Sequence, residues 1–138
     1  MNSTTYRVLC SYAGPYLVRP HPWPVPAAEP FPLVFSTAVY IALDAGGRCC
    51  YVGSVCRAVG GLRERVSEHL GDPAKRAIWH VIWVLPLVAD TPSHEVRRIE
   101  GVVGAHLGPA LSRRLPSARP PSSGDANAVR GSMVEVRP

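Results

Sequence analysis

The chain of 138 residues has little lysine, no paired cysteine motif and no long apolar segment. Because no run of about eighteen apolar residues occurs and no basic segment precedes an apolar one near Met1, we expect a soluble, cytoplasmic protein without membrane association. The four cysteines show no C-x-x-C spacing, which argues against a structural zinc site and favours reduced thiols. Lys75 is the only lysine among fifteen basic residues, and the net charge of +5 favours polyanionic partners without identifying one.

Fifteen prolines gather toward the two ends of the chain. In residues 1–35 they predict an extended arm laid over the domain surface, with Trp23 and Phe31 as anchors, while residues 5–10 could form a lone strand. A ligand for a proline-binding partner is the alternative interpretation of this arm.

The other end of the chain, residues 116–138, is rich in Pro, Ser, Gly and Ala and predicts a disordered tail. One compact domain is therefore expected over residues 36–115, a length at which a single core is small and stability is modest.

Two strands are predicted near the start of this domain. Residues 36–43 alternate between two sets of side chains, which is the period of a strand, and residues 49–54 form a second strand after an Asp-Ala-Gly-Gly-Arg turn. The two strands therefore predict an antiparallel hairpin.

Helical periodicity follows the hairpin. Residues 62–70 place an apolar side chain at every fourth position, residues 75–79 suit a short helical turn, and residues 80–88 form an apolar run typical of a buried third strand. A Thr-Pro start and a Gly-Pro stop bound a last helix whose buried face carries Val96, Ile99 and Val103. The predicted fold class is α/β of the α+β type, with a three-stranded, mainly antiparallel sheet flanked by helices.

Three polar residues occupy positions that could carry chemistry. Arg65 and His69 are four apart and project from one side of the first helix, although a solvated pair is the ordinary interpretation. Glu100 lies at the edge of a buried helix face, so it needs a partner. The candidates are an ion pair with Arg97 or Arg98, a metal ion and a more distant cation.

Two tyrosines fall on one face of the hairpin. If Leu43 pairs with Arg48 across the turn, Tyr40 lies directly opposite Tyr51 and the phenols are side by side. By themselves, two tyrosines on a sheet usually indicate packing.

The order of these residues resembles that of the GIY-YIG nucleases, a family that includes the N-terminal nuclease domain of a bacterial excision-repair enzyme. Members of this family carry two tripeptides, then a Leu-x-x-Arg-x-x-x-His/Tyr helix, a third strand, and a helix with a single glutamate. The matching residues, in chain order, are Ala38-Val39-Tyr40, Tyr51-Val52-Gly53, Leu62, Arg65, His69, Ile99-Glu100 and Pro109.

This chain departs from the family pattern at two functional positions. Ser54 stands where many members have lysine, so Arg57, Arg63 or His69 would have to supply the positive charge beside the tyrosines. The family's asparagine after the proline aligns with Ser112, which could keep a hydrogen-bonding role.

The resemblance implies an endonuclease that hydrolyses DNA phosphodiester bonds with one Mg²⁺ or Mn²⁺, bound by Glu100 largely through waters. Arg65 would neutralise the attacked phosphate, and Tyr40 or Tyr51 would orient or deprotonate the attacking water. His69 would contact the phosphate or relay the proton. The candidate substrate contacts are Gly53, Ser54, Arg57, Arg63 and Ser112.

Two other functions fit the sequence. A catalytically weakened GIY-YIG module that binds nucleic acid without cutting it is suggested by Ser54 and Ser112, and a protein-interaction domain is suggested by the Pro-rich arm. No separate DNA-reading motif occurs, so a homodimer or a partner protein could supply specificity.

Overall fold

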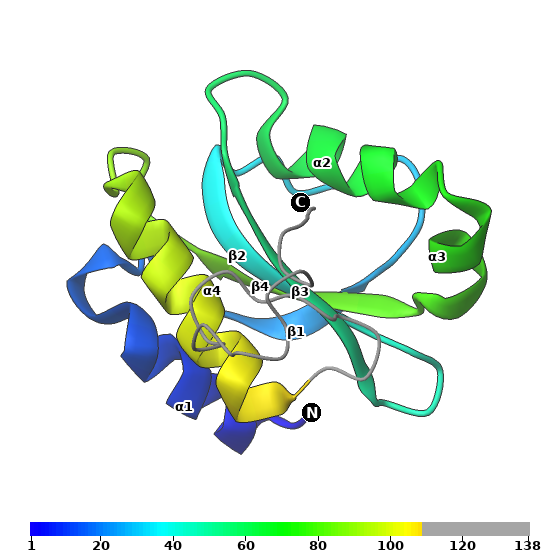
Figure 1. Ribbon diagram of the computed structural model, residues 1–138, viewed down its shortest axis with the longest axis horizontal. Helices are drawn as coiled ribbons and strands as arrows, with labels where there is room; N and C mark the ends of the chain where they lie inside the picture. Colours follow the sequence, from blue (N-terminus) through cyan, green and yellow to red (C-terminus); the bar gives the residue numbers. More distant parts are fainter. Residues whose placement is uncertain (109–138) are drawn as a thin grey trace, which may run out of the picture.

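A computed structural model describes residues 1–108; Ser112, Pro109 and the expected tail lie outside the described residues. The elements are α1 (Ser3–Ala13), the 3-10 helix η1 (Gly14–Tyr16), β1 (His21–Pro26), β2 (Thr37–Leu43), β3 (Cys49–Cys56), α2 (Gly61–Leu70), α3 (Pro73–Ile78), β4 (Val81–Pro86) and α4 (Ser93–Leu107). The strands form one antiparallel sheet in the order β1-β4-β2-β3 (Figure 1). The α+β class is confirmed, whereas the expected number of three strands is wrong.

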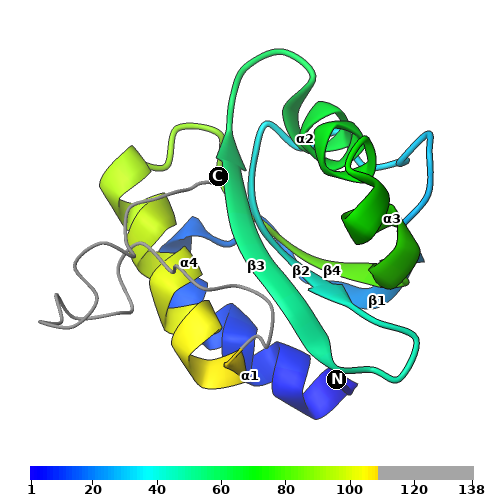
Figure 2. The ribbon, with the colours of Figure 1, turned by 45° about the vertical axis from the view of Figure 1, so that its right-hand side comes forward.

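Helices cover both faces of the sheet. In Figure 2 the edge strand β3 lies in front, with α1 and α4 on one side of the sheet and α2 and α3 on the other. Within residues 1–108, no helix has the length and apolar character needed to cross a membrane.

The beginning of the chain is a helix, so the strand expected at residues 5–10 is wrong. Tyr6, Leu9 and Ala13 recur at helical spacing and are buried against the sheet and α4. The side chain of Asn2 caps the helix by accepting a hydrogen bond from a backbone N–H of the first turn. The segment expected to be an extended arm therefore contributes a helix to the fold.

The Pro-rich segment contributes the fourth strand, β1, at the edge of the sheet. Prolines at alternate positions remove ladder donors, which an edge strand tolerates and a central strand does not. The Tyr6 hydroxyl joins β1 to β4, because it accepts a hydrogen bond from His21 N at 2.8 Å and donates one to Val84 O at 2.5 Å. Of the two predicted anchors, Phe31 is buried, but Trp23 is exposed.

The central strand β2 is buried along its whole length. Val39 and Ile41 face α1 and α4, while Ala38, Tyr40 and Ala42 face α2, as the alternation predicted. Strand β2 therefore connects the two layers of the core.

The register of the β2–β3 hairpin differs from the predicted one. Leu43 pairs with Cys49 instead of Arg48, and a bulge then places Tyr40 opposite Gly53. Tyr51 is diagonal to Tyr40 on the same face, with ring centroids 6.2 Å apart. The carboxylate of the turn's first residue accepts hydrogen bonds from two turn N–H groups, and this tight turn together with the bulge sets the register.

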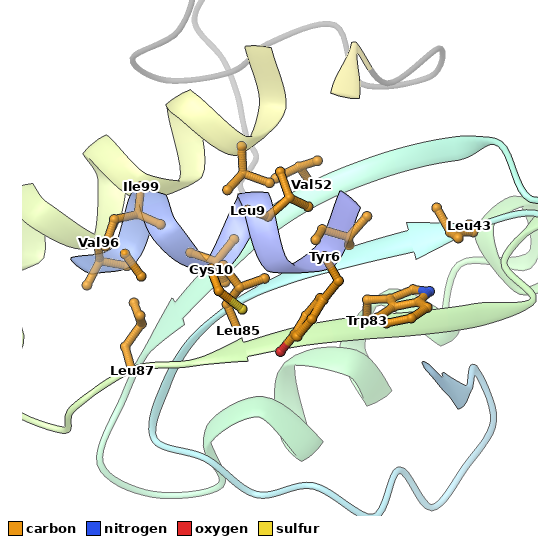
Figure 3. Packing of buried hydrophobic residues seen from close by; sticks show 14 residues of the cluster. Tyr6, Leu9, Cys10, Leu43, Val52, Trp83, Leu85, Leu87, Val96 and Ile99 are labelled. Atoms are coloured by element: carbon orange, nitrogen blue, oxygen red, sulfur yellow. The ribbon is translucent and has the colours of Figure 1, made fainter. Parts of the chain in front are cut away.

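Two hydrophobic layers enclose the sheet. Figure 3 shows the first layer, in which Tyr6 of α1 lies beside Trp83, while Val96 and Ile99 of α4 pack at the other end of the layer, near Leu87. The second layer lies under α2 and consists of Val25, Phe31, Ala38, Tyr40, Ala42, Cys50, Val55, Leu62, Val66, Leu70, Trp79, Ile82 and Val84. The buried faces predicted for α2 and α4 are confirmed. Because these two helices lie on opposite sides of the sheet, the candidate residues that they carry also lie on opposite sides.

Candidate functional site

A chain of polar side chains runs between α3, α2 and the central strand. Nε2 of His69 lies 2.8 Å from the hydroxyl oxygen of Tyr40, and Nζ of Lys75 lies 2.9 Å from Nδ1 of the same imidazole. Tyr40 is fully buried and His69 is 5% exposed, so these hydrogen bonds satisfy polar groups that water does not reach.

Arg65, one turn before His69 on α2, extends this network toward solvent. Its side chain hydrogen-bonds Tyr40, and its Nη1 donates to Glu68 at 3.0 Å. Burial lowers the pKa of Arg65, but Tyr40, Glu68 and Tyr51 together raise it above its ordinary value. The guanidinium is therefore charged and fixed in place, and the side chain as a whole is 21% exposed.

Glu68 is shared by two arginines. Nη1 of Arg57 donates to one carboxylate oxygen at 2.9 Å, and Arg65 donates to the other. The hydrogen bond from Arg57, followed by that from Arg65, lowers the pKa of Glu68. This carboxylate holds both guanidinium groups at the end of the site that faces solvent.

An aromatic group surrounds the Lys75 amine. The ring centroids of Tyr51 and His69 are 4.9 Å apart, and Trp79 lies 5.4 Å from Tyr51 and 4.9 Å from His69. Nζ of Lys75 is 5.2 Å from the centroid of Tyr51 and 5.9 Å from that of Trp79, within the range of cation–π attraction. Positive charge therefore lies close to the ring of Tyr51.

Gly53 provides the space that the two tyrosines need. A Cβ added at this position would lie 2.7 Å from the hydroxyl oxygen of Tyr40 and 2.7 Å from Cε2 of Tyr51. Since such distances are too short for carbon contacts, the rings can lie over β3 only because residue 53 has no side chain.

Glu100 lies on the opposite face of the sheet. It is 8% exposed, as its position at the edge of the buried helix face predicted, and Ser54 donates a hydrogen bond to its Oε1 at 2.6 Å. The sequence suggested Arg97 or Arg98, a metal ion or a more distant cation as the partner, and it did not single out this serine hydroxyl. The bond joins α4 to β3 directly.

The structure thus separates the predicted catalytic residues into two groups. Tyr40, Tyr51, Arg65 and His69 form one cluster between α2 and the sheet, whereas Glu100 lies on α4, on the other side of the sheet. Consecutive strand residues point to opposite faces, so Gly53 in the first group and Ser54 in the second connect the two across β3 (Figure 2). The candidate site therefore lies on both sides of the edge strand β3.

The remaining predicted contacts have different positions. Arg57 is close to α2 through its ion pairs with Glu64 and Glu68. Arg63 instead donates to the carbonyl oxygens of Phe31 at 2.7 Å and Pro32 at 3.3 Å, which fastens the segment before β2 to α2. Its role in this structure is to hold the fold together.

Sequence reasoning missed Glu68 and Lys75 as site residues. Glu68 could have been found, because it lies three residues after Arg65 on a predicted helix. For Lys75, the sequence offered no indication of a functional role beyond its being the only lysine. Its contact with His69 depends on how α3 folds back on α2, which local periodicity does not determine.

Metal binding by this site is limited by its donors. Within residues 1–108, no group of three His, Cys, Asp or Glu side chains is placed to hold a metal ion. A hydrated Mg²⁺ commonly uses one or two carboxylates together with substrate phosphates, so Glu100 fits a metal site that the substrate completes. It does not fit a site formed by protein ligands alone.

No family model matches the chain, and no curated protein or solved structure matches it at a significant level.

Proposed function

We propose that this chain is a GIY-YIG-type endonuclease that hydrolyses DNA phosphodiester bonds with the help of one Mg²⁺ or Mn²⁺. What supports the proposal is that residues from three separate motifs meet in one cluster, joined by hydrogen bonds and by ring contacts. Tyr40 comes from the first tripeptide, Tyr51 from the second, and Arg65 and His69 from the helix that follows. Packing alone does not require an arginine, a histidine and two phenols at one point.

Different exposure of the two tyrosines supports different roles for them. Tyr40 is fully buried, whereas Tyr51 is partly exposed and stacks beside it. A group that orients or deprotonates the attacking water must reach that water, so Tyr51 takes this role. Tyr40 fixes the positions of His69 and Arg65 through its hydroxyl.

Arg65 supplies positive charge to the phosphate. Its guanidinium is held by Tyr40 and Glu68 and is partly open to solvent, so it can contact a non-bridging oxygen without large rearrangement. Arg57, which shares Glu68, would contact the neighbouring DNA backbone.

Glu100 would hold the divalent ion, which when bound supplies positive charge to the oxygen of the leaving group. Ser54 fixes the orientation of this carboxylate through the hydrogen bond to Oε1. Because Glu100 and Tyr51 lie on opposite sides of β3, the phosphodiester would bind along the edge of the sheet beside Gly53 and Ser54.

The proposal is tested with supercoiled plasmid and a panel of branched DNAs in Mg²⁺, Mn²⁺ or EDTA. Arg65→Met and Glu100→Gln are compared with two matched controls, Arg7→Met on the exposed side of α1 and Glu95→Gln on α4. Glutamine keeps an oxygen that can accept from Ser54, so Glu100→Gln removes the charge while leaving the fold intact.

We expect metal-dependent nicking by the wild type and both controls, and a loss of about a hundredfold or more in the two site variants. If the wild type cuts none of these DNAs but still binds them in a salt-sensitive manner, the enzymatic function is refuted. The chain would then be a non-catalytic nucleic-acid-binding module.

A further inference from the structure

The hydrogen bond between Lys75 and His69 determines which ring nitrogen carries the proton. A lysine ammonium has three donors and no acceptor, so Nδ1 of His69, 2.9 Å from Nζ, must accept. A neutral imidazole that accepts at Nδ1 carries its proton on Nε2. The tautomer of His69 thus follows from the position of the only lysine in the chain.

The same reasoning extends to the phenol of Tyr40. Since Nε2 of His69 carries the proton and lies 2.8 Å from the Tyr40 oxygen, it donates to that oxygen. Arg65 has donors only, so its hydrogen bond with Tyr40 runs in the same direction. The Tyr40 oxygen therefore accepts hydrogen bonds from two N–H groups, one of His69 and one of Arg65.

We propose that Lys75 is a positioning residue of this site, which holds His69 in the Nε2-protonated tautomer and directs its N–H to the Tyr40 oxygen. The tautomer follows from the contacts alone, whereas its catalytic consequence rests on the proposed nuclease function. A lysine that only packs on the rings of Tyr51 and Trp79 would not fix the proton on one nitrogen. Lys75→Met distinguishes the two roles, because it keeps the long apolar stem and a good helix former but removes the donor.

The tautomer is measured on ¹⁵N-labelled protein by long-range ¹H–¹⁵N spectra of the imidazoles. The spectra are recorded at about pH 8, above the ordinary histidine pKa of about 6.5. The chain has five histidines, and His69→Gln identifies the signals of residue 69. In the wild type we expect Nδ1 of His69 to be unprotonated and Nε2 to be protonated. In Lys75→Met we expect the signals to move toward a mixture of the two tautomers.

Arg76→Met is the matched control, because it removes one positive charge from the next, exposed position of the same helix. Its His69 signals should coincide with those of the wild type. A wild-type His69 protonated at Nδ1 would refute the proposal without reference to any variant. Unchanged His69 signals in Lys75→Met, or equal changes in both variants, would refute it as well.

Kinetics give a second, separable readout. If the wild type cleaves DNA, Lys75→Met should lower kcat by about tenfold to a hundredfold, the usual effect of losing a group that orients a functional residue, with a smaller change in KM. A kcat equal to that of the wild type would overturn the catalytic consequence. If the wild type does not cleave DNA, the nuclease proposal fails, and the imidazole spectra still decide the role of Lys75.

Discussion

Replacing Gly53 with alanine tests whether the tyrosine cluster depends on the missing side chain. The new Cβ would lie 2.7 Å from the hydroxyl oxygen and 2.8 Å from Cζ of Tyr40, and 2.7 Å from Cε2 of Tyr51. Tyr51 is partly exposed and can move away. Tyr40 is fully buried, so its ring can shift only if its hydrogen bond to His69 is strained or broken.

Two opposing effects set the size of the change. Alanine in place of an unhindered strand glycine stabilises a protein by about 0.5–1 kcal/mol. Overpacking a buried site costs about 1–3 kcal/mol, and a lost hydrogen bond adds about 1 kcal/mol. We therefore expect Gly53→Ala to lower the free energy of unfolding by about 1–3.5 kcal/mol, which corresponds to a fall in Tm of about 4–28 °C in a domain of about 100 residues.

The assay is urea denaturation together with thermal unfolding. Gly46→Ala, in the β2–β3 turn, is the matched control, because its added Cβ would meet only Oδ1 of Asp44 at an ordinary 3.5 Å. The control should stay within about 0.5 kcal/mol of the wild type. A Gly53→Ala protein as stable as the wild type, with its His69 signals unmoved, would show that the tyrosines are not confined as described.

Three further predictions concern stability and thiol chemistry. Tyr6→Phe removes the hydroxyl that joins β1 to β4, so it should lower the free energy of unfolding, measured by urea denaturation, by about 1–3 kcal/mol. Tyr12→Phe, at an exposed contact, should lower it by less than about 0.5 kcal/mol. Equal losses in the two variants would contradict the bridging role of Tyr6. Because the hydrogen bond from Arg57 and then that from Arg65 lower the folded-state pKa of Glu68, its contribution is present above the unfolded pKa of about 4.3 and is lost as pH falls through the folded value. Glu68→Gln should therefore reduce the loss of stability between about pH 5 and 3 by less than about 1 kcal/mol, and a steeper loss would refute this assignment. Burial raises the pKa of Cys49 to about 12, so iodoacetamide at about pH 8 should modify this thiol only after unfolding, which peptide mass spectrometry would detect; rapid modification in the native protein would contradict it.

Elements with strong periodicity were predictable from the sequence. In α2 the apolar residues Leu62, Val66 and Leu70 recur at every fourth position and are all buried. In β2 a period of two separated the two faces correctly. These patterns arise from the geometry of the backbone itself, so they can be recognised in the sequence without knowledge of the rest of the fold.

The first part of the chain was not predictable in the same way. The helix α1 buries Tyr6 and Leu9. The β-branched residues beside them, Thr4, Thr5 and Val8, are typical of strands, which favoured the wrong prediction. In β1, prolines at alternate positions suggested polyproline conformation, and only the position of the segment beside β4 makes it a strand. Both elements are decided by a partner that is distant in the sequence.

The sequence by itself determined the α+β class, the order of the candidate residues, and the side of its own helix or strand on which each one lies. Only the tertiary structure decided that a bulge sets Tyr40 opposite Gly53, that Lys75 reaches His69, and that Glu100 and the tyrosines lie on opposite faces of the sheet. The physical reason is that backbone periodicity orients a side chain relative to its own element, whereas the distance between two elements is set by turns, bulges and long-range packing.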